Sequence, residues 1–121
     1  MIFVFGSNEA GRHGKGAAKY AKLKYGAIQG QGFGRQGDSF AIPTKDYDLN
    51  PLDVGLIKAY FEDFVEYARE NHDTMFFLTP IGCGLAGNDP REIMQMMYGV
   101  GIPRNVVLSS SWVTDHGSCF T

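Results

Sequence analysis

The sequence predicts a three-layer α/β/α domain, because strand-like and helix-like segments alternate along the chain. Residues 2–16 and 76–90 share one construction, in which an apolar strand leads through a glycine-rich turn to a helix start. Between them, residues 51–71 carry the apolar stripe of an amphipathic helix. The 121 residues suit one domain spanning 1–121, and 44% hydrophobic with 20% charged residues is typical of a folded globular chain.

The first expected strand, residues 2–5, is apolar at every position, which suits a strand buried on both faces. A polar glycine loop over residues 6–16 leads from it into a lysine-rich helix expected over residues 17–25. Residues 26–37 hold five glycines and cannot form a stable helix. This segment is therefore either a flexible flap or an irregular surface loop.

A short strand is expected over residues 39–43, with Pro43 ending it. Lys45 follows at its carboxyl end, which is where ligands bind in open α/β sheets. The helix over residues 51–71 is then expected, with Asn50 or Asp53 as its cap. Its apolar stripe predicts a core contribution from Leu56, Ile57, Tyr60, Phe61, Phe64, Val65 and Ala68.

Residues 76–78 predict another buried strand, followed by a glycine turn and a short Met-rich helix that begins near Pro90. Asn88 or Asp89 is expected to cap this helix. A last apolar strand is expected over residues 105–108, before a polar tail with one tryptophan.

Composition narrows the classes of function. The formal net charge of −2 argues against a general duplex nucleic-acid binder, which needs a basic face. Apolar runs are too short for a membrane span, and no secretory leader is visible, so we expect a cytoplasmic protein with reduced Cys83 and Cys119. His72, His116 and Cys119 form no metal-ligand pattern, and we expect neither a metal nor a cofactor.

The two glycine-rich turns at residues 6–16 and 82–89 predict an anion site. Glycines expose backbone N–H groups, and a helix N-terminus favours negative charge. One such loop is often only a tight turn, whereas two in a small domain indicate a ligand with two phosphates held between them. Neither loop has the spacing of a P-loop or of a dinucleotide-binding fold.

The segments SNEAGRHGKGAA and FFLTPIGCGLAG resemble the two phosphate loops of the macrodomain superfamily, which binds ADP-ribose. The resemblance extends from about Phe3 to Met97. IPTKD, a long helix and IGCGL look most like the branch of terminal ADP-ribose glycohydrolases, and small macro-like proteins of bacteria and phages share the opening. The resemblance implies a macrodomain-like α/β/α sandwich with a mixed sheet.

By matching position, Asn8 is implied to face the distal ribose, while the glycine loops contact the diphosphate. The ligand-binding residues implied in this way are Ser7, Asn8, Gly11, Gly14, Gly16, Ala17, Ile81, Gly82, Cys83, Gly84, Leu85 and Ala86. Lys45 matches the lysine that attacks the anomeric carbon in the glycohydrolase branch. Its alternative is a surface charge paired with Asp46 or Asp48.

Three further residues have two readings each. His13 is either a phosphate donor or acid/base, or an exposed loop histidine. Asp89 either assists catalysis or caps a helix. Cys83 is either a reactive thiolate or a small buried residue. Phe33 and Trp112 are candidates to stack on a base, although single aromatic residues are more often packing.

One position departs from the glycohydrolase branch, which places an aspartate directly after IGCGL. Here that residue is Ala86. We therefore expect binding of ADP-ribose, or of a related nucleotide diphosphate-sugar, free or on an ADP-ribosylated macromolecule. The alternatives are an ADP-ribosyl glycohydrolase that uses Lys45, and a protein-interaction module that kept the fold without a ligand.

Overall fold

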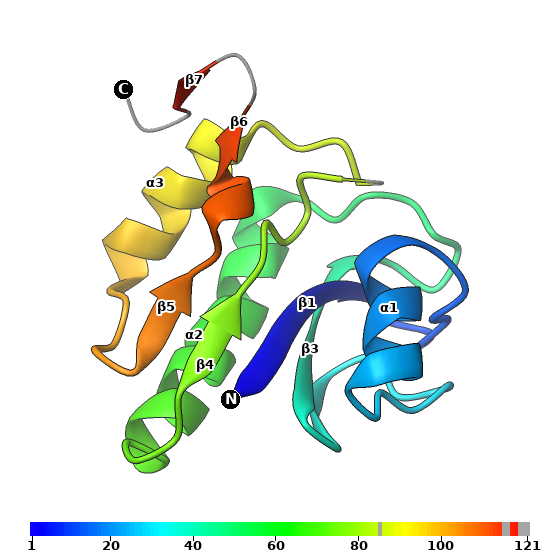
Figure 1. Cartoon of the computed structure of the whole chain (residues 1–121). Helices are drawn as coiled ribbons and strands as arrows, with labels where there is room; N and C mark the ends of the chain where they lie inside the picture. Colours follow the sequence, from blue (N-terminus) through cyan, green and yellow to red (C-terminus); the bar gives the residue numbers. More distant parts are fainter. Residues whose placement is uncertain (85, 115–116, 119–121) are drawn as a thin grey trace.

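The computed structural model describes residues 1–84, 86–114 and 117–118. A mixed five-stranded sheet in the order β2-β3-β1-β4-β5 lies between helices, with α1 on one face and α2 and α3 on the other (Figure 1). The predicted three-layer arrangement is confirmed. The strands are β1 (Ile2–Asn8), β2 (Gly34–Gln36), β3 (Ser39–Lys45), β4 (Phe76–Leu78), β5 (Val106–Leu108), β6 (Val113–Thr114) and β7 (Gly117–Ser118). The helices are α1 (Gly16–Lys24), α2 (Val54–Glu70), α3 (Pro90–Val100) and the 3-10 turn η1 (Ser110–Trp112).

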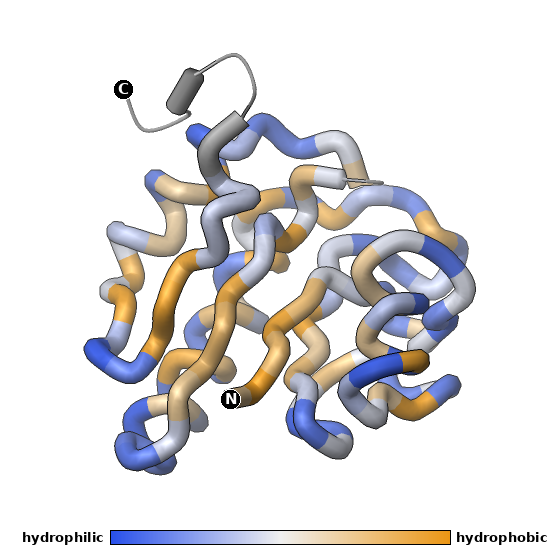
Figure 2. Tube along the Cα trace, viewed as in Figure 1, coloured by the Kyte–Doolittle hydropathy of each residue, from blue (hydrophilic) through white to orange (hydrophobic). Residues whose placement is uncertain are grey.

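The central strand β1 is buried on both faces, as its unbroken apolar sequence predicts. Ile2 and Val4 belong to the larger core under α2 and α3, whereas Phe3 and Phe5 belong to the smaller core under α1. Successive side chains of a strand point to opposite faces, so one apolar run supplies both cores. Figure 2 shows this concentration of apolar residues along β1, β4 and β5.

The parallel pairing of the sheet places three strand ends side by side. β1 pairs in parallel with β3 on one side and with β4 on the other, while β2 runs antiparallel along β3. The carboxyl ends of β1, β3 and β4 therefore meet at one edge of the sheet. In α/β sheets this edge is where ligands bind.

The expected end of the third strand is wrong. β3 continues past Pro43 to Lys45, because β2 pairs with β3 only as far as Ala41. At Pro43 the strand pairs with β1 on one side, while on the other side β2 has ended and residues 51–52 join only from Thr44 onward. The missing N–H of the proline is tolerated in this gap. The register between β1 and β3 also shifts between Ser7 and Asn8, opposite this proline.

The long helix starts later than expected. The backbone of residues 51–52 follows β3 instead, with a bridge between Lys45 and Pro51, and α2 begins after Asp53. Leu56 is 53% exposed and so lies outside the stripe. The buried stripe consists of Ile57, Phe61, Phe64, Val65 and Ala68, while Tyr60 packs at its margin.

None of the helices in the described ranges has the length and apolar character needed to cross a membrane. Nor does that part of the chain bring together three His, Cys, Asp or Glu side chains that could hold a metal ion. His116 and Cys119, which the sequence analysis considered as metal ligands, lie outside the described residues.

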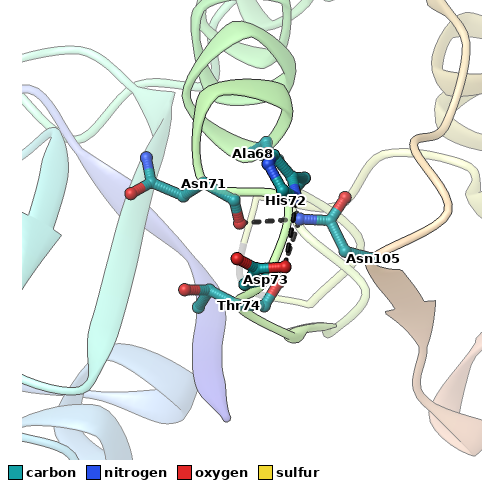
Figure 3. Close-up of polar contacts among 6 residues, drawn as sticks. All are labelled: Ala68, Asn71, His72, Asp73, Thr74 and Asn105. Atoms are coloured by element: carbon teal, nitrogen blue, oxygen red, sulfur yellow. Dashed lines mark hydrogen bonds and ion pairs between the residues drawn. The ribbon is translucent and has the colours of Figure 1, made fainter.

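A buried asparagine joins the carboxyl end of α2 to β5. Nδ2 of Asn105 donates to the carbonyl oxygens of Ala68, Asn71 and Thr74 at 2.9, 3.1 and 2.9 Å (Figure 3). Ala68 lies in the last turn of α2 and Asn71 at its cap, where carbonyl groups lack regular intrahelical partners. The buried Asn105 side chain joins this end of the helix to the turn at Thr74. The neighbouring contact between His72 and Asp73 is fully at the surface.

Tyr60 and Glu9 form a second tie, between α2 and the end of β1. The Tyr60 hydroxyl donates to Oε2 of Glu9 at 2.5 Å. The hydrogen bond to this carboxylate, together with partial burial and the negative charge of Glu9, raises the pKa of Tyr60 to about 12. Glu9 also donates its backbone N–H to the carbonyl oxygen of Lys45, so the tie reaches the ends of both β1 and β3.

Replacing Asn105 by alanine is expected to lower the free energy of unfolding by about 2–3 kcal/mol, because buried carbonyl groups lose their donor. Urea unfolding followed by circular dichroism measures this change. Asn50→Ala is the matched control, since Asn50 is exposed and its side chain makes no hydrogen bond among the described residues. Equal unfolding midpoints for the two variants would contradict the role given to Asn105.

The Tyr60–Glu9 contact predicts a pH dependence. Because the pKa of Tyr60 lies above its ordinary value of about 10, the contact stabilises the fold below pH 10, and this contribution disappears as the pH rises toward 12. Glu9→Gln is expected to move the pKa of Tyr60 back toward its ordinary value. Titration of the Tyr60 Cζ resonance by NMR measures this pKa. Glu62→Gln is the control, because Glu62 is exposed on α2, the helix that carries Tyr60. An unchanged titration in Glu9→Gln refutes the assignment.

Candidate functional site

A cavity of about 380 Å³ opens at the carboxyl ends of β1, β3 and β4. Its lining comes from the end of β1, the start of α1, the end of β3 and the loop that follows β4. The lining residues are Gly6, Ser7, Lys15, Gly16, Ala17, Ala18, Thr44, Lys45, Thr79, Pro80, Gly82, Gly84 and Ala86. The two glycine-rich loops of the sequence thus form opposite walls of one cavity.

The first wall is the N-terminus of α1. Lys15 occupies the cap position without a side-chain hydrogen bond, and no acidic residue lies in the first turn. The first N–H groups of a helix have no intrahelical acceptor. Gly16, Ala17 and Ala18 bring these groups to the cavity. The wall therefore presents unpaired donors and the positive end of the helix dipole.

The second wall is the turn over residues 81–88. Asn88 closes this turn, because its backbone N–H and its Nδ2 both donate to the carbonyl oxygen of Gly82, at 2.9 and 3.0 Å. Within the described residues, the backbone N–H groups of Gly82, Gly84 and Ala86 make no hydrogen bond. This wall also presents unpaired donors to the cavity.

Between the walls, the floor of the cavity depends on a close backbone approach. A Cβ atom at Gly6 would lie 3.2 Å from the backbone nitrogen of Gly82, which is tighter than ordinary packing allows without movement. Gly82 itself has a φ of 72°, a conformation that favours glycine. The second loop can therefore lie directly over β1.

Two of the lining side chains are charged, and both are lysines. Lys15 is exposed on the wall formed by α1, and Lys45 is half-buried at the end of β3. No carboxylate occurs among the described lining residues. The cavity is thus locally positive in a chain of net charge −2, which suits a ligand with more than one negative charge.

The alternative reading of Lys45, as a surface charge paired with a neighbouring aspartate, does not match its surroundings. The described part of the chain shows no ion pair between Lys45 and Asp46 or Asp48. Oδ1 of Asp46 instead accepts from the backbone N–H groups of Asp48 and Asn50, each at 2.9 Å. The ammonium group of Lys45 is therefore available to the cavity.

Several expected residues of the first loop lie away from the cavity. Asn8 uses both ends of its amide within the loop, since Oδ1 accepts from Arg12 N and Nδ2 donates to Arg12 O, at 2.8 and 2.9 Å. Gly11 and Gly14 are also absent from the lining. Asn8 and Gly11, which has a φ of 71°, thus have structural roles in the loop, and the ligand contacts that the resemblance implied for these three residues stay a prediction.

His13 is neither a phosphate donor at the cavity nor an exposed loop residue. Its side chain is 0% exposed, and Nε2 lies 2.9 Å from Gln31 O and 3.2 Å from Gln36 Oε1. Both partners accept a hydrogen here, so Nε2 carries the proton, while Nδ1 has no partner within the described residues. The ring also meets the Phe5 ring edge-on. His13 is a buried support beneath the loop.

The glycine-rich segment 26–37 provides the partners of that support. Gly30 donates its N–H to Gly11 O at 2.8 Å, and the Ser7 hydroxyl donates to Gly32 O. A Cβ atom at Gly32 would collide with the carbonyl oxygen of Asn8. Residues 26–33 are therefore a loop packed on the first glycine loop. Gly34–Gln36 form the edge strand β2 instead, which neither reading of this segment as a flap or as an irregular loop predicted.

In the second loop, the structure separates lining residues from supporting ones. Ile81 is buried in the larger core, and the half-buried Cys83 donates its thiol hydrogen to Ile81 O. Asp89 caps α3 by accepting from Arg91 N at 3.0 Å, which is the helix-cap role that the sequence analysis gave as the alternative to catalysis. Leu85 lies outside the described residues. Ile81, Cys83 and Asp89 do not line the cavity.

Part of the lining was not predicted from the sequence, namely Gly6, Lys15, Ala18, Thr44, Thr79 and Pro80. Thr44 and Thr79 share a signal that could have identified them. Each follows the apolar run of a strand that neighbours β1 in parallel. Polar residues at that point of adjacent parallel strands are candidates for a ligand site.

Comparison with solved structures matches the chain to the macrodomain of DarG from Mycobacterium tuberculosis. The match has a TM-score of 0.67 and 22% sequence identity, and it covers 88% of this chain and 86% of that chain. No protein-family model and no curated protein matches the sequence. At this identity the likeness concerns the fold. The chain has the macrodomain fold that the two glycine-rich loops predicted.

Proposed function

We propose that the chain binds ADP-ribose or a related nucleotide diphosphate-sugar, with the diphosphate between its two glycine-rich loops. One observation carries the proposal: residues from both loops whose backbone N–H groups make no hydrogen bond among the described residues line the same cavity. Such groups bind phosphate oxygens without a change in their own conformation. The macrodomain fold and the resemblance of both loops support this class of ligand.

The charges of the cavity support a dianionic ligand in particular. Lys15 and Lys45 approach from different walls, and no described lining residue carries a negative charge to oppose them. The donors and the lysines together match the two phosphate groups better than a single carboxylate. Ser7, Thr44 and Thr79 also line the cavity, but their hydroxyl groups already donate to the carbonyl oxygens of Gly32, Ser7 and Val4, so towards a sugar they can act only as acceptors.

Catalysis has one residue in its favour and one against it. Lys45 lines the cavity, as the glycohydrolase reading requires. Ala86 also lines it, at the position where the glycohydrolase branch places its aspartate. Glu9 is hydrogen-bonded to Tyr60 and Asp89 caps α3, so neither is free to replace that carboxylate. Binding is therefore the function that the site supports best.

Calorimetric titration with ADP-ribose tests the proposal. We expect Lys15→Ala and Lys45→Ala each to weaken binding about three- to ten-fold, because each removes a cation next to the diphosphate. Lys58→Ala, on the exposed face of α2, is the matched control and is expected to leave the affinity unchanged. An absence of heat with the folded wild-type chain would overturn the proposal and favour the interaction-module alternative.

A second variant tests the loop itself. A Cβ atom at Gly84 meets no atom within 4 Å, so a side chain there is compatible with folding. Gly84→Glu is expected to abolish binding, since its carboxylate repels the diphosphate, whereas Gly84→Ala keeps most of the affinity. If Gly84→Glu binds as well as wild type, the second loop does not hold the phosphates.

Release of free ADP-ribose from modified substrates, lost in Lys45→Ala, would instead establish the glycohydrolase.

A further inference from the structure

We propose that the cavity selects its ligand through the diphosphate and the sugar, and that the nucleobase contributes little to affinity. The inference rests on the proposed function and specifies the ligand class of the same site. It starts from a contrast: lysines and unpaired backbone N–H groups belong to residues that line the cavity, whereas the aromatic and acidic residues nearby do not line it.

The size and chemistry of the cavity favour a small, phosphorylated sugar. Its volume of about 380 Å³ lies near the lower end of the roughly 300–1,000 Å³ typical of ligand pockets. The described lining consists of glycine, alanine, serine, threonine, proline and lysine residues. These residues suit phosphate oxygens and hydroxyl groups, whereas a base is ordinarily held against an aromatic or large apolar side chain.

The aromatic residues considered as base platforms are used elsewhere. Trp112 is 1% exposed, and its Nε1 donates to the carbonyl oxygen of Leu78 at 2.9 Å. The Phe33 ring lies against Phe40 and Tyr60, with ring centres 5.5 Å apart in each pair. Trp112 lies in the core and the half-buried Phe33 packs against it, and neither ring lines the cavity.

The carboxylates near the two loops lie outside the cavity lining. An adenine amino group needs an acceptor, and Glu9, Asp46, Asp48 and Asp89 are the acidic side chains closest in sequence to the lining residues. One oxygen of Glu9 already accepts from the Tyr60 hydroxyl, one of Asp46 from two backbone N–H groups, and one of Asp89 from Arg91 N. None of the four carboxylates lines the cavity, whereas the glycine loops and lysines that suit a diphosphate do.

One exposed aromatic residue offers a direct test. Tyr47 is 65% exposed in the turn after β3, two residues from Lys45, and it does not line the cavity. The inference predicts that Tyr47→Ala leaves the affinity for ADP-ribose unchanged. A ring that stacked on the base would make this variant bind more weakly.

The experiment is calorimetric titration of the full chain with four probes: ADP-ribose, its hypoxanthine analogue, an abasic diphosphate that joins two ribose groups, and adenosine. We expect the first three to bind within about three-fold of one another, and adenosine to give no heat at millimolar concentration. Ten-fold weaker binding of the hypoxanthine or abasic probe would overturn the inference while leaving the proposed function intact. So would a ten-fold loss in Tyr47→Ala that is seen with ADP-ribose and not with the abasic probe. No heat with any probe would overturn both the proposed function and this inference.

Discussion

The close approach of the second loop to β1 is the constraint on which the site depends. Gly6 and Gly82 approach so closely that a methyl group on Gly6 would lie 3.2 Å from the backbone nitrogen of Gly82 and would require a small shift of the loop. This contact fixes the height of the second wall above the sheet, while the paired ends of β1 and β3 fix the position of Lys45. The donors are therefore held in place before a ligand arrives, so little of the binding free energy is needed to order them.

The two helix N-termini near the site have different roles. α1 begins without a side-chain cap or an acidic residue in its first turn, and its free N–H groups face the cavity. α3 begins with Asp89 bonded to Arg91 N, so its N-terminus is already satisfied. The buried His13 and the segment 26–37 pack against the first loop and support it through hydrogen bonds. The side chains of Asn8 and His13 thus support the loop, while Lys15 and the first residues of α1 line the cavity.

Much of this arrangement could be predicted from the sequence, because it follows from local pattern. Apolar runs predicted β1, β3, β4 and β5, the helical period predicted α2, and the glycine turns predicted the two loops that line the cavity. The strands β2, β6 and β7 have no such run and were not predicted. The roles of Asn8 and His13 could not be predicted in this way. His13 finds its partners at Gln31 and Gln36, and only the fold brings that segment under the first loop. The extension of β3 through Pro43 likewise depends on where β2 stops pairing, which no local signal reveals.

The central claim is that backbone N–H groups of both loops hold the diphosphate. Backbone ¹H–¹⁵N NMR spectra recorded during titration with ADP-ribose test it most directly. The account predicts the largest shifts at the amides of Ala17, Ala18, Gly82 and Gly84, with small shifts on the exposed face of α2. Binding that leaves these four amides unmoved and shifts resonances elsewhere would contradict it.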